Sequence, residues 1–529
     1  MNELETILIE RYPMCQFFQI GKDNNVIYDA KANFAFILSD NESGLLANFL
    51  TKGKITTGWN KAEMPIINRF MALCDCGVFL EGPAETVSDE EREIIQNKVL
   101  YYDNNILQRK FVLEATEDCN FRCKYCPNTI NAGTDVRHHT KRKMSIETAK
   151  VAIDYYFEQY VKIFKKLSVE KQSLLLETLP PTLSWYGGEP LLNFEVMEQA
   201  TEYFKQKPWH IIGVKTENLF FSTNSNMSIM NDRILDFLVE NKVQLFASLD
   251  GPKEENDKCR VFADGSGTFD IIVKNLRKIR ERDEDYFKQH VSILCVQADG
   301  YNNEACEKYF KEGEFSDLMV SASRQEYVGC SYLDPIGTLQ LKKNSFENDL
   351  KEMLDEINKV EISDSPSEDI SVLLPYVNIQ TDNPKGTNNL GVTLTCPMGI
   401  DNNMIGVNGD IHICHKTDGS APFANIHHLP IDYGKLVDIY INHNKAVNQG
   451  GCRSCWAVRY CSDCGAKRLQ KGKMTNPTFD ECEVMRLEQK LYMTAFFYAM
   501  QNRPDVIDYL EKKRNNRHEY ISIMDIHTF

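Results

Sequence analysis

From residue 110 onward, the hydrophobic pattern repeats a strand, a loop and an amphipathic helix. Short apolar runs predict strands over 111–116, 182–186, 219–222, 245–249, 291–296 and 318–321. Apolar positions at helical spacing predict helices between them over 146–165, 194–204, 232–240 and 269–279. Strands that alternate with amphipathic helices pair in parallel through right-handed crossovers. We therefore expect an α/β fold with a partial (β/α)6 barrel over residues 106–335.

The segment before the barrel follows a different pattern. Strand-like runs occupy 17–20, 26–28 and 34–38, and helical patterns follow over 45–50 and 66–73. A further helix is expected to start at Ser88-x-x-Glu91, a capping box in which Ser88 accepts from the amides of the first turn. These elements predict a separate domain, a hairpin followed by helices, over residues 1–105.

Behind the barrel the pattern predicts three more regions. A charged helix over 345–360 and an acidic stretch over 362–370 form an expected linker domain at 336–390. Cysteines then dominate a domain expected at 391–500, which ends in a helix over 484–500. Residues 501–529 are polar and predict only a C-terminal tail.

Composition narrows the class of protein. The 529 residues carry a formal net charge of −16, which repels phosphate backbones and argues against nucleic acid as a partner. Neither an apolar run near the ~20 residues of a membrane span nor a basic amphipathic helix is present, so we expect no membrane partner. The start MNELETILIERYP lacks the features of a secretion signal, which predicts a cytoplasmic protein. There the 17 cysteines stay reduced, and clusters of them favour metal over disulfides.

Three cysteines directly follow the first barrel strand. Cys119, Cys123 and Cys126 lie within eight residues. A zinc knuckle or a chance spacing are the alternatives, but zinc usually takes four N/S ligands. Three thiolates can hold a [4Fe–4S] cluster and leave one iron without a protein ligand. Loops after barrel strands are also where barrel chemistry takes place, so the triplet predicts a catalytic iron–sulfur site.

The triplet resembles the motif of the radical S-adenosylmethionine (SAM) superfamily, C-x3-C-x-aromatic-C, with Tyr125 at the aromatic position. The resemblance implies that SAM binds the open iron through its amino and carboxylate groups. One electron from the cluster then splits SAM into methionine and a 5′-deoxyadenosyl radical, which removes a hydrogen atom from the substrate. Cys119, Cys123 and Cys126 would be the catalytic cluster ligands.

Residues at the following strand ends suit the same cofactor. Gly187, Gly188 and Glu189, followed by Pro190, end the second strand; in the resembled superfamily this segment contacts the SAM amino group, and a plain tight turn is the alternative. Asn224 and Ser248 offer short polar groups for ribose hydroxyls. Arg260 is expected to bind the SAM carboxylate, because guanidinium pairs with carboxylate bidentately.

A second set of cysteines fills the C-terminal region. Its C-x2-C pairs at Cys452 and Cys461 are separated by five residues, too few for a zinc ribbon, which needs about 15–20, although zinc remains the alternative. The set is similar to the SPASM domain of radical SAM enzymes that modify peptides. That resemblance implies two auxiliary [4Fe–4S] clusters, an outer one on Cys452, Cys455, Cys461 and Cys482 and an inner one on Cys396, Cys414 and Cys464.

Counting ligands leaves one position open. Ten cysteines fill all but two positions of three four-iron clusters, and SAM accounts for one of these. The other falls on the inner auxiliary cluster. A spare cysteine such as Cys330, a water or a substrate thiolate could fill it. A substrate cysteine held there would have a lowered pKa and could join to a carbon radical.

The N-terminal module bears on the substrate. A hairpin followed by helices is similar to the winged-helix-like domain that pairs with the leader of a ribosomally made precursor peptide through a strand edge; a structural lid or a dimerisation domain are the alternatives. The basic run Arg137 to Lys143 is expected to be a solvated loop, or to receive an acidic leader or electron donor. His138, His139, His412 and His415 are given no role.

The leading hypothesis is a radical SAM peptide maturase, similar to sactipeptide or ranthipeptide enzymes, that forms Cys thioether crosslinks in a precursor peptide. Its partners would be that peptide and a flavodoxin- or ferredoxin-type electron donor. Three alternatives remain: a maturase that forms C–C or C–O crosslinks, an anaerobic sulfatase-maturing enzyme that generates formylglycine, and a non-catalytic iron–sulfur protein that binds peptides and transfers electrons.

Overall fold

A computed structural model of the chain describes most of its residues. It covers residues 3–523 except for 22–23, 83–90, 106–109, 135, 298–300, 325–326, 329–330, 333–334, 363–367, 382–397, 401, 450 and 462. Cys396, Cys330 and the expected cap Ser88 fall outside the described residues.

The centre of the molecule is a nine-stranded sheet in the order β14-β13-β12-β4-β5-β6-β7-β8-β9. All six predicted strands are confirmed, and they pair in parallel in chain order. Their bounds are β4 (Lys110–Thr116), β5 (Thr182–Gly187), β6 (Phe220–Ser225), β7 (Gln244–Ser248), β8 (Val291–Gln297) and β9 (Met319–Arg324). The mixed α/β fold with a central parallel sheet is therefore confirmed.

Helices cover this sheet in the predicted places. Ser145 and Asn231 cap two of them by accepting from the amides of Thr148 and Ile234. The helices of this part are α5 (Pro127–Ile130), α6 (Ile146–Phe164), α7 (Val169–Thr178), α8 (Phe194–Gln206), α9 (Asp232–Glu240), α10 (Lys253–Cys259), α11 (Phe269–Arg282), α12 (Glu284–His290) and α13 (Asn303–Glu312). Short 3-10 turns are η1 (Pro190–Asn193), η2 (Trp209–Ile212) and η3 (Thr216–Asn218).

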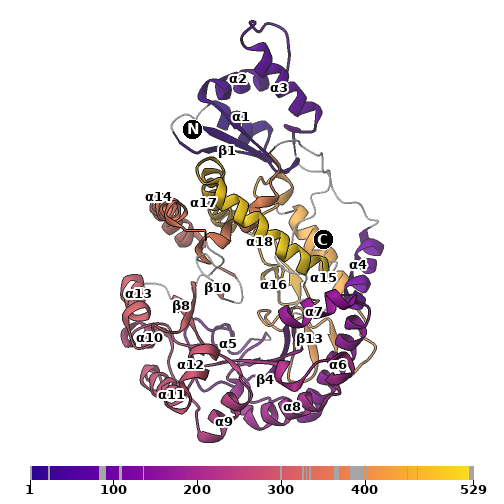
Figure 1. Cartoon of the computed structure of the whole chain (residues 1–529), viewed down its shortest axis with the longest axis vertical. Coiled ribbons are helices and arrows are strands. Elements are labelled where there is room, and N and C mark those ends of the chain that lie inside the picture. Colours follow the sequence, from indigo (N-terminus) through magenta and orange to yellow (C-terminus); the bar gives the residue numbers. More distant parts are fainter. Residues whose placement is uncertain are drawn as a thin grey trace.

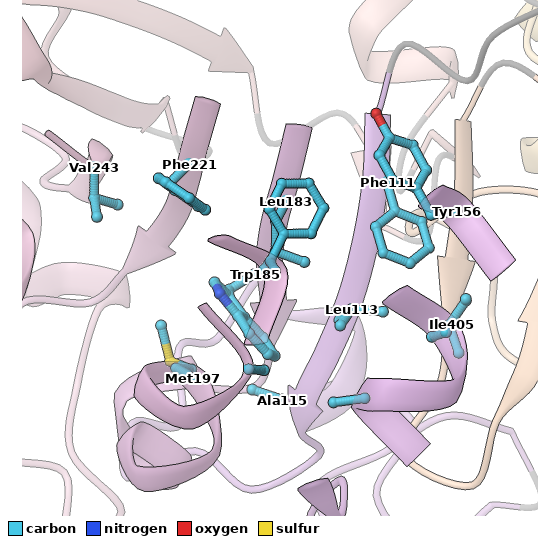
Figure 2. Close-up of a cluster of buried hydrophobic side chains, with 14 of the residues drawn as sticks. Phe111, Leu113, Ala115, Tyr156, Leu183, Trp185, Met197, Phe221, Val243 and Ile405 are labelled. Carbon is cyan, nitrogen blue, oxygen red and sulfur yellow. The ribbon is translucent and has the colours of Figure 1, made fainter. Parts of the chain in front are cut away.

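The space between sheet and helices is filled by large apolar side chains (Figure 2). Phe111 on β4 stacks on Tyr156 of α6 with ring centroids 4.5 Å apart. Trp185 on β5 is buried and lies near Met197 of α8 in the same cluster. This packing fixes β4 and β5, whose ends carry the first cysteine loop and the glycine pair.

The chain behind the barrel adds to the same sheet. β12 (Asn402–Ile405) pairs in parallel with β4, and β13 (Asp410–His412) and β14 (Ala424–Asn425) follow in antiparallel order. Ile405, Ile411 and Tyr440 belong to the barrel core. The remaining elements here are α15 (Gly434–Gln449), η5 (Cys452–Ser454), α16 (Gly465–Arg468), β15 (Leu469–Gln470) and β16 (Lys473–Met474).

The N-terminal residues form a three-stranded antiparallel sheet with helices, at the top of Figure 1. The predicted strands are present, and Ser39 with Glu42 forms a capping box that starts α2. A first helix, α1, was not predicted. The elements are α1 (Glu3–Arg11), β1 (Cys15–Gln19), β2 (Asn25–Asp29), β3 (Phe34–Leu38), α2 (Asp40–Thr51) and α3 (Met64–Asp75), followed by α4 (Glu91–Asn105).

C-terminal helices lie between this module and the barrel (Figure 1). Phe18 on β1 packs edge-on against Trp456 and Phe497, with ring centroids 5.9 and 5.2 Å apart. The elements of this layer are α14 (Pro335–Lys359), η4 (Glu368–Asn378), α17 (Phe479–Asn502) and α18 (Pro504–Ile523), with the short strands β10 (Tyr327–Val328) and β11 (Ser331–Tyr332) nearby in sequence.

The C-terminal end differs from the prediction. Residues 504–523 form α18 rather than an irregular tail, and Val506 and Leu510 on it are fully buried. α17 begins at Phe479, five residues before the predicted start, because the Thr478 side chain forms a capping box with Glu481. Among the described helices, none combines the length and the apolar character needed to cross a membrane.

Candidate functional site

The first cysteine loop begins directly after β4. It is held along the 259–262 segment: the Arg122 amide donates to the Val261 carbonyl and the Lys124 amide to the Cys259 carbonyl, at 2.8 and 2.9 Å. Phe121 in the loop is buried and meets Phe262 edge-on, with ring centroids 4.8 Å apart. The loop therefore has a defined path although it contains almost no regular secondary structure.

The three thiols of this loop lie in one largely buried environment. Burial raises the pKa of Cys119 to about 12, and the nearby Glu189 and the other two thiols add to the shift. Burial also raises the pKa of Cys123 to about 11, against the lowering effect of Arg260. Among the described residues, no three His, Cys, Asp or Glu side chains have the close spacing of a single-ion site. A four-iron cube holds its thiolates farther apart than one ion does, because each binds a different iron.

A buried ion pair lies beside these thiols. Arg260 donates from Nε and Nη2 to the two carboxylate oxygens of Asp250, at 3.2 and 2.8 Å, and both side chains are almost fully buried. The Tyr125 hydroxyl donates to Asp250 at 2.6 Å, and the Arg260 guanidinium lies 5.6 Å from the centre of the Tyr125 ring. The structure thus brings two expected SAM-binding residues together through Asp250, whose pairing role was not predicted.

The glycine pair joins two strand ends. Gly187 has φ +142°, and a Cβ there would lie 2.3 Å from the Thr116 carbonyl oxygen. A Cβ on Gly188 would lie 2.2 Å from the carbonyl oxygen of Asp118. The Gly188 amide donates to the first of these carbonyls and the Glu189 amide to the second, each at 2.8 Å. The absence of a Cβ at these two glycines therefore lets the backbone of residues 116–118 pack directly against them. The sequence had predicted that a ligand would approach the glycines here.

Glu189 is buried under this junction. Its carboxylate accepts from the amides of Leu191 and Asn226, at 3.1 and 2.6 Å, and from the Ser225 hydroxyl at 3.1 Å. Burial raises the pKa of Glu189 to about 7, although these hydrogen bonds act in the opposite direction. The carboxylate thus links the end of β5 to the end of β6.

Asn226 belongs to the same polar run as Asn224 and lies beside the first cysteine loop. Its side-chain amide lies 3.7 Å from the Cys119 sulfur and donates to Asn120 at 2.9 Å. The expected residues Asn224 and Ser248 stand at the ends of β6 and β7 with partly buried side chains. The sequence shows that Asn226 lies in the polar run at the end of β6. It does not show that Asn226 contacts Cys119, because that contact depends on how the strands pair.

Arg137 connects the first cysteine loop to the C-terminal cysteines. The expectation of a solvated basic loop is wrong for this residue: its side chain is 10% exposed and pairs with the buried Glu114 at 2.5 Å. Its Nη1 donates to the His415 carbonyl at 2.9 Å, and its amide donates to the Asp418 carbonyl. His415 follows Cys414 directly, so Arg137 ties the two cysteine regions together. Lys141, by contrast, is 86% exposed.

Tyr186 and His415 pack around Arg137 where the two cysteine regions meet. The Arg137 guanidinium lies 5.7 Å from the centre of the Tyr186 ring, and that ring meets His415 edge-on at 4.9 Å. His412 on β13 is buried, and burial lowers its pKa to about 4. Burial also lowers the pKa of His139 to about 4. Both imidazoles are therefore neutral near pH 7.

Four C-terminal thiols line a single pocket of about 650 Å³, part of it open to solvent. They are those of Cys452, Cys455, Cys461 and Cys482. Burial raises the pKa of Cys452 to about 12, with Cys482 and Cys455 adding to the shift. Arg468 on the same pocket pairs with Asp463 at 2.6 Å and with Glu481 at 2.9 Å. Arg486 interacts with the Cys455 sulfur.

The remaining expected ligands form a smaller group. Burial is the main cause of the raised pKa of Cys414, and the nearby Cys464 thiol adds to the shift. Cys396, their expected partner, lies outside the described residues, and so does the possible spare ligand Cys330. The structure therefore brings together the four thiols expected at the outer site and two of the three expected at the inner one.

Two curated proteins have sequences similar to part of this chain. A radical SAM cyclopropyl synthase, TigE, of Paramaledivibacter caminithermalis is 24% identical over 276 residues, which cover 50% of this chain and 53% of that protein. A cysteine-type anaerobic sulfatase-maturating enzyme of Clostridium novyi is 26% identical over 226 residues, 42% of this chain and 50% of its own. The chain thus spans about half the length of these curated relatives.

A solved structure, native anSMEcpe with bound AdoMet, covers 76% of this chain and 98% of its own, at 20% identity and a TM-score of 0.48. Residues 113–312 match the Radical SAM superfamily, whose members are enzymes. The superfamily implies one [4Fe–4S] cluster and SAM as cofactors. The matched segment runs from β4 to the end of α13 and includes the first cysteine loop, so this chain carries a radical SAM domain.

Proposed function

We propose that the chain is a radical SAM maturase that modifies a side chain of a ribosomally made precursor peptide. The observation that carries this proposal is the loop of Cys119, Cys123 and Cys126, one buried and two partly buried thiols at the carboxyl edge of the parallel sheet. The donor set suits an iron–sulfur cluster, because thiolates are the usual ligands of such clusters and three of them leave one iron free to bind SAM. When bound, the cluster with SAM supplies a 5′-deoxyadenosyl radical that removes a substrate hydrogen atom.

The surrounding residues would hold SAM in place. Arg260 engages Asp250 through two nitrogens, and a guanidinium has five N–H donors, so donors remain for the SAM carboxylate. Asn224 and Ser248 would bind polar groups of the nucleoside. Glu189 would act by fixing Ser225 and Asn226 beside the cysteine loop, since its oxygens already accept three hydrogen bonds.

The C-terminal thiols would hold two auxiliary clusters in a SPASM domain. The pocket lined by Cys452, Cys455, Cys461 and Cys482 brings together four soft ligands for the outer one. Cys414 and Cys464, with Cys396, would hold the inner one. An open position on the inner cluster would bind a substrate thiolate and direct the enzyme toward Cys thioether formation. A flavodoxin- or ferredoxin-type protein would be the electron donor.

The N-terminal module would bind the leader peptide in the manner of a winged-helix-like domain. Its sheet has two borders, and the β3 border is already used: Ala35 and Asn33 bond to Gln380, and the Ile37 carbonyl accepts from Arg69. β1 is the other edge strand, and among the described residues no further strand pairs with it, so a leader strand could add to the sheet there. A precursor peptide bound there would be a substrate of the barrel site.

A sulfatase-maturating activity is the second candidate. The relative from Clostridium novyi carries that name, and its identity to this chain is comparable with that of the cyclopropyl synthase. Such an enzyme would convert one side chain to an aldehyde rather than join two residues. The sequence motifs do not distinguish a crosslinking enzyme from a sulfatase-maturating one, but the chemical identity of the product does.

The test uses the full chain reconstituted with iron and sulfide and supplied with SAM and dithionite. We expect 5′-deoxyadenosine from the wild type and none when Cys119, Cys123 and Cys126 are all replaced by Ala; product from that variant would refute the catalytic assignment. Three clusters predict about twelve irons and twelve sulfides, whereas zinc without sulfide would refute the auxiliary sites. Precursor peptides are then treated with a thiol alkylating reagent. Thioether formation protects cysteines from it, C–C or C–O crosslinks leave them reactive, and formylglycine reveals itself as an aldehyde.

A further inference from the structure

His443 lies in the wall of the pocket that the four C-terminal thiols line. It stands on α15, is 2% exposed, and shares the pocket with Cys452, Cys455, Cys461 and Cys482. Neither the sequence motif nor the comparisons give this residue a role. Its position on a helix outside the cysteine motif makes it a separate contribution to the pocket.

The imidazole has an unsatisfied nitrogen. Nδ1 of His443 is buried and makes no hydrogen bond, although the Asn444 side chain also interacts with the ring. Among the described residues that line the pocket, no other buried side-chain nitrogen or oxygen lacks a partner. A buried polar atom without a partner costs about 1–3 kcal/mol, and native proteins rarely retain one without a reason.

The other polar groups of the pocket are already paired with each other. Arg468 donates to Asp463 and Glu481, and among the described residues neither carboxylate accepts a hydrogen bond from Nδ1 of His443. Nδ1 of His443 therefore has no hydrogen-bond partner in the described part of the chain. The group that fits is one that occupies the pocket itself and carries acceptor sulfur atoms.

We propose that the Nδ1–H of His443 donates a hydrogen bond to a sulfur of the outer auxiliary cluster and raises its reduction potential. The inference rests on the proposed function, because it requires an iron–sulfur cluster on these four thiolates. Hydrogen bonds to cluster sulfurs set reduction potentials. The reduced cluster carries one more negative charge, and a donor stabilises it more than the oxidised form. His443 is then a positioning and tuning residue, acting through the sulfur and not on the substrate.

Two substitutions separate a hydrogen bond from packing. His443→Leu keeps an apolar side chain in the wall and removes the donor. His443→Asn keeps an N–H near the position of Nδ1 and removes most of the ring. A matched control on the same helix is Tyr440→Phe, which removes a buried hydrogen bond to the Met398 carbonyl away from the pocket. All are made in the background in which Cys119, Cys123 and Cys126 are Ala, so that the first cluster does not contribute to the signal.

The measurement is a redox titration of the reconstituted full chain followed by EPR. With His443→Leu we expect the ratio of oxidised to reduced outer cluster at a fixed potential to rise about tenfold, a shift of about 59 mV for a one-electron couple. His443→Asn should recover most of the shift, and Tyr440→Phe should show the parent potential. Hyperfine spectra of the reduced cluster should show an exchangeable proton that disappears with His443→Leu.

The possible results separate a hydrogen bond from packing. An unchanged potential with His443→Leu at full iron and sulfide content would overturn the proposal, and so would equal shifts with Leu and Asn. If His443→Leu alone loses the cluster while His443→Asn keeps it at the parent potential, the donor is supported as a condition for holding the cluster. If neither variant holds it, the role is packing and the proposal fails. Failure of the parent to bind iron and sulfide at the four thiols would instead refute the proposed function.

Discussion

At the scale of single residues, the junction around Arg137 shows how much one buried charge can hold together. Glu114 is 3% exposed, and its pKa is raised by burial although Arg137 opposes this. Removing one partner of a buried ion pair leaves the other charge without compensation. Removing either charge alone should therefore lower the stability of the fold more than removing both charges together.

We predict that Arg137→Gln lowers the free energy of unfolding by roughly 3–5 kcal/mol, as for other broken buried pairs. Chemical denaturation of the cluster-free protein measures this. The double variant with Glu114→Gln should recover a large part of the loss, because no unpaired charge remains. Lys141→Gln is the matched control, since its pair with Asp118 is exposed on the lysine side and should contribute at most about 1 kcal/mol. A loss for Lys141→Gln as large as that for Arg137→Gln would contradict the argument.

Glu189 gives a prediction about pH. Its pKa is about 7 in the folded chain and 4.5 when unperturbed. The native state therefore binds this proton more tightly than the unfolded chain, and the stability present below pH 4.5 is lost as the pH rises through about 7. A shift of this size corresponds to roughly 3 kcal/mol.

Glu189→Gln should remove this component. The difference in unfolding free energy between wild type and variant, measured by denaturation from about pH 4.5 to about pH 8, should change in favour of the variant as the pH rises. Taking the difference cancels the opposite contributions of buried His412 and His139, whose lowered pKa values make stability rise with pH in an overlapping range. A difference that stays constant with pH would mean that the pKa of Glu189 is not raised.

At the scale of elements, the border strand β1 carries the prediction about peptide binding. Successive residues along a strand present their amides to opposite sides. At the two ends of β1, Met14 and Ile20 bond toward β2, and the alternation leaves the amides of Phe17 and Gln19 facing the border. Adding a leader peptide should slow hydrogen exchange at the amides of Phe17 and Gln19. Exchange at Ala35 on β3 should change little, because that amide already donates to Gln380. Protection confined to β3 would place the leader elsewhere.

The barrel strands and helices could be predicted because burial on both faces leaves near-continuous apolar runs along parallel strands. Other elements have a hydrophobic pattern too weak to predict from the sequence. β12 has the sequence Asn402-Asn403-Met404-Ile405, with only two apolar residues, and is a strand because it pairs with β4. α18 buries Val506 and Leu510, a single helical spacing that does not stand out from a polar tail. Such elements form through tertiary contacts, which override local preference.

Part of the candidate site could likewise be predicted from the sequence, and part could not. The three thiols of the first loop lie close together in sequence, so their spacing alone predicts that they share a site. The partners of Arg137 and Arg260 could not be predicted, because Glu114 and Asp250 meet them only when the intervening segments fold back on the strand ends. The glycine pair was identified, but its close neighbour proved to be the backbone of Thr116 and Asp118. Sequence spacing locates ligands in a loop, while side-chain partners depend on the fold.

At the scale of the whole molecule, the N-terminal module and the C-terminal helices share one core. Phe18, Tyr28 and Ala35 belong to the same buried cluster as Trp456 and Phe497. Arg459 donates to the carbonyls of Ala30 and Lys31, and Tyr460 donates to Asn33 at 3.0 Å. The module is therefore built into the structure, and removing residues 1–100 would expose apolar side chains. Point variants on β1 are the sounder way to study peptide binding.

We predict that Phe18→Ala destabilises both parts together. Loss of a buried Phe side chain costs about 3–5 kcal/mol, and Phe18 is 1% exposed. Hydrogen exchange in low denaturant should show protection falling by a similar free energy in β1 to β3 and in α17, because the two sides lose the same contact. Phe479→Ala is the control: this Phe is 72% exposed and its loss should change stability by no more than about 0.5 kcal/mol. Protection lost only in the N-terminal strands would show that the module opens independently, and a leader peptide could then bind it without affecting the helices that carry Cys482.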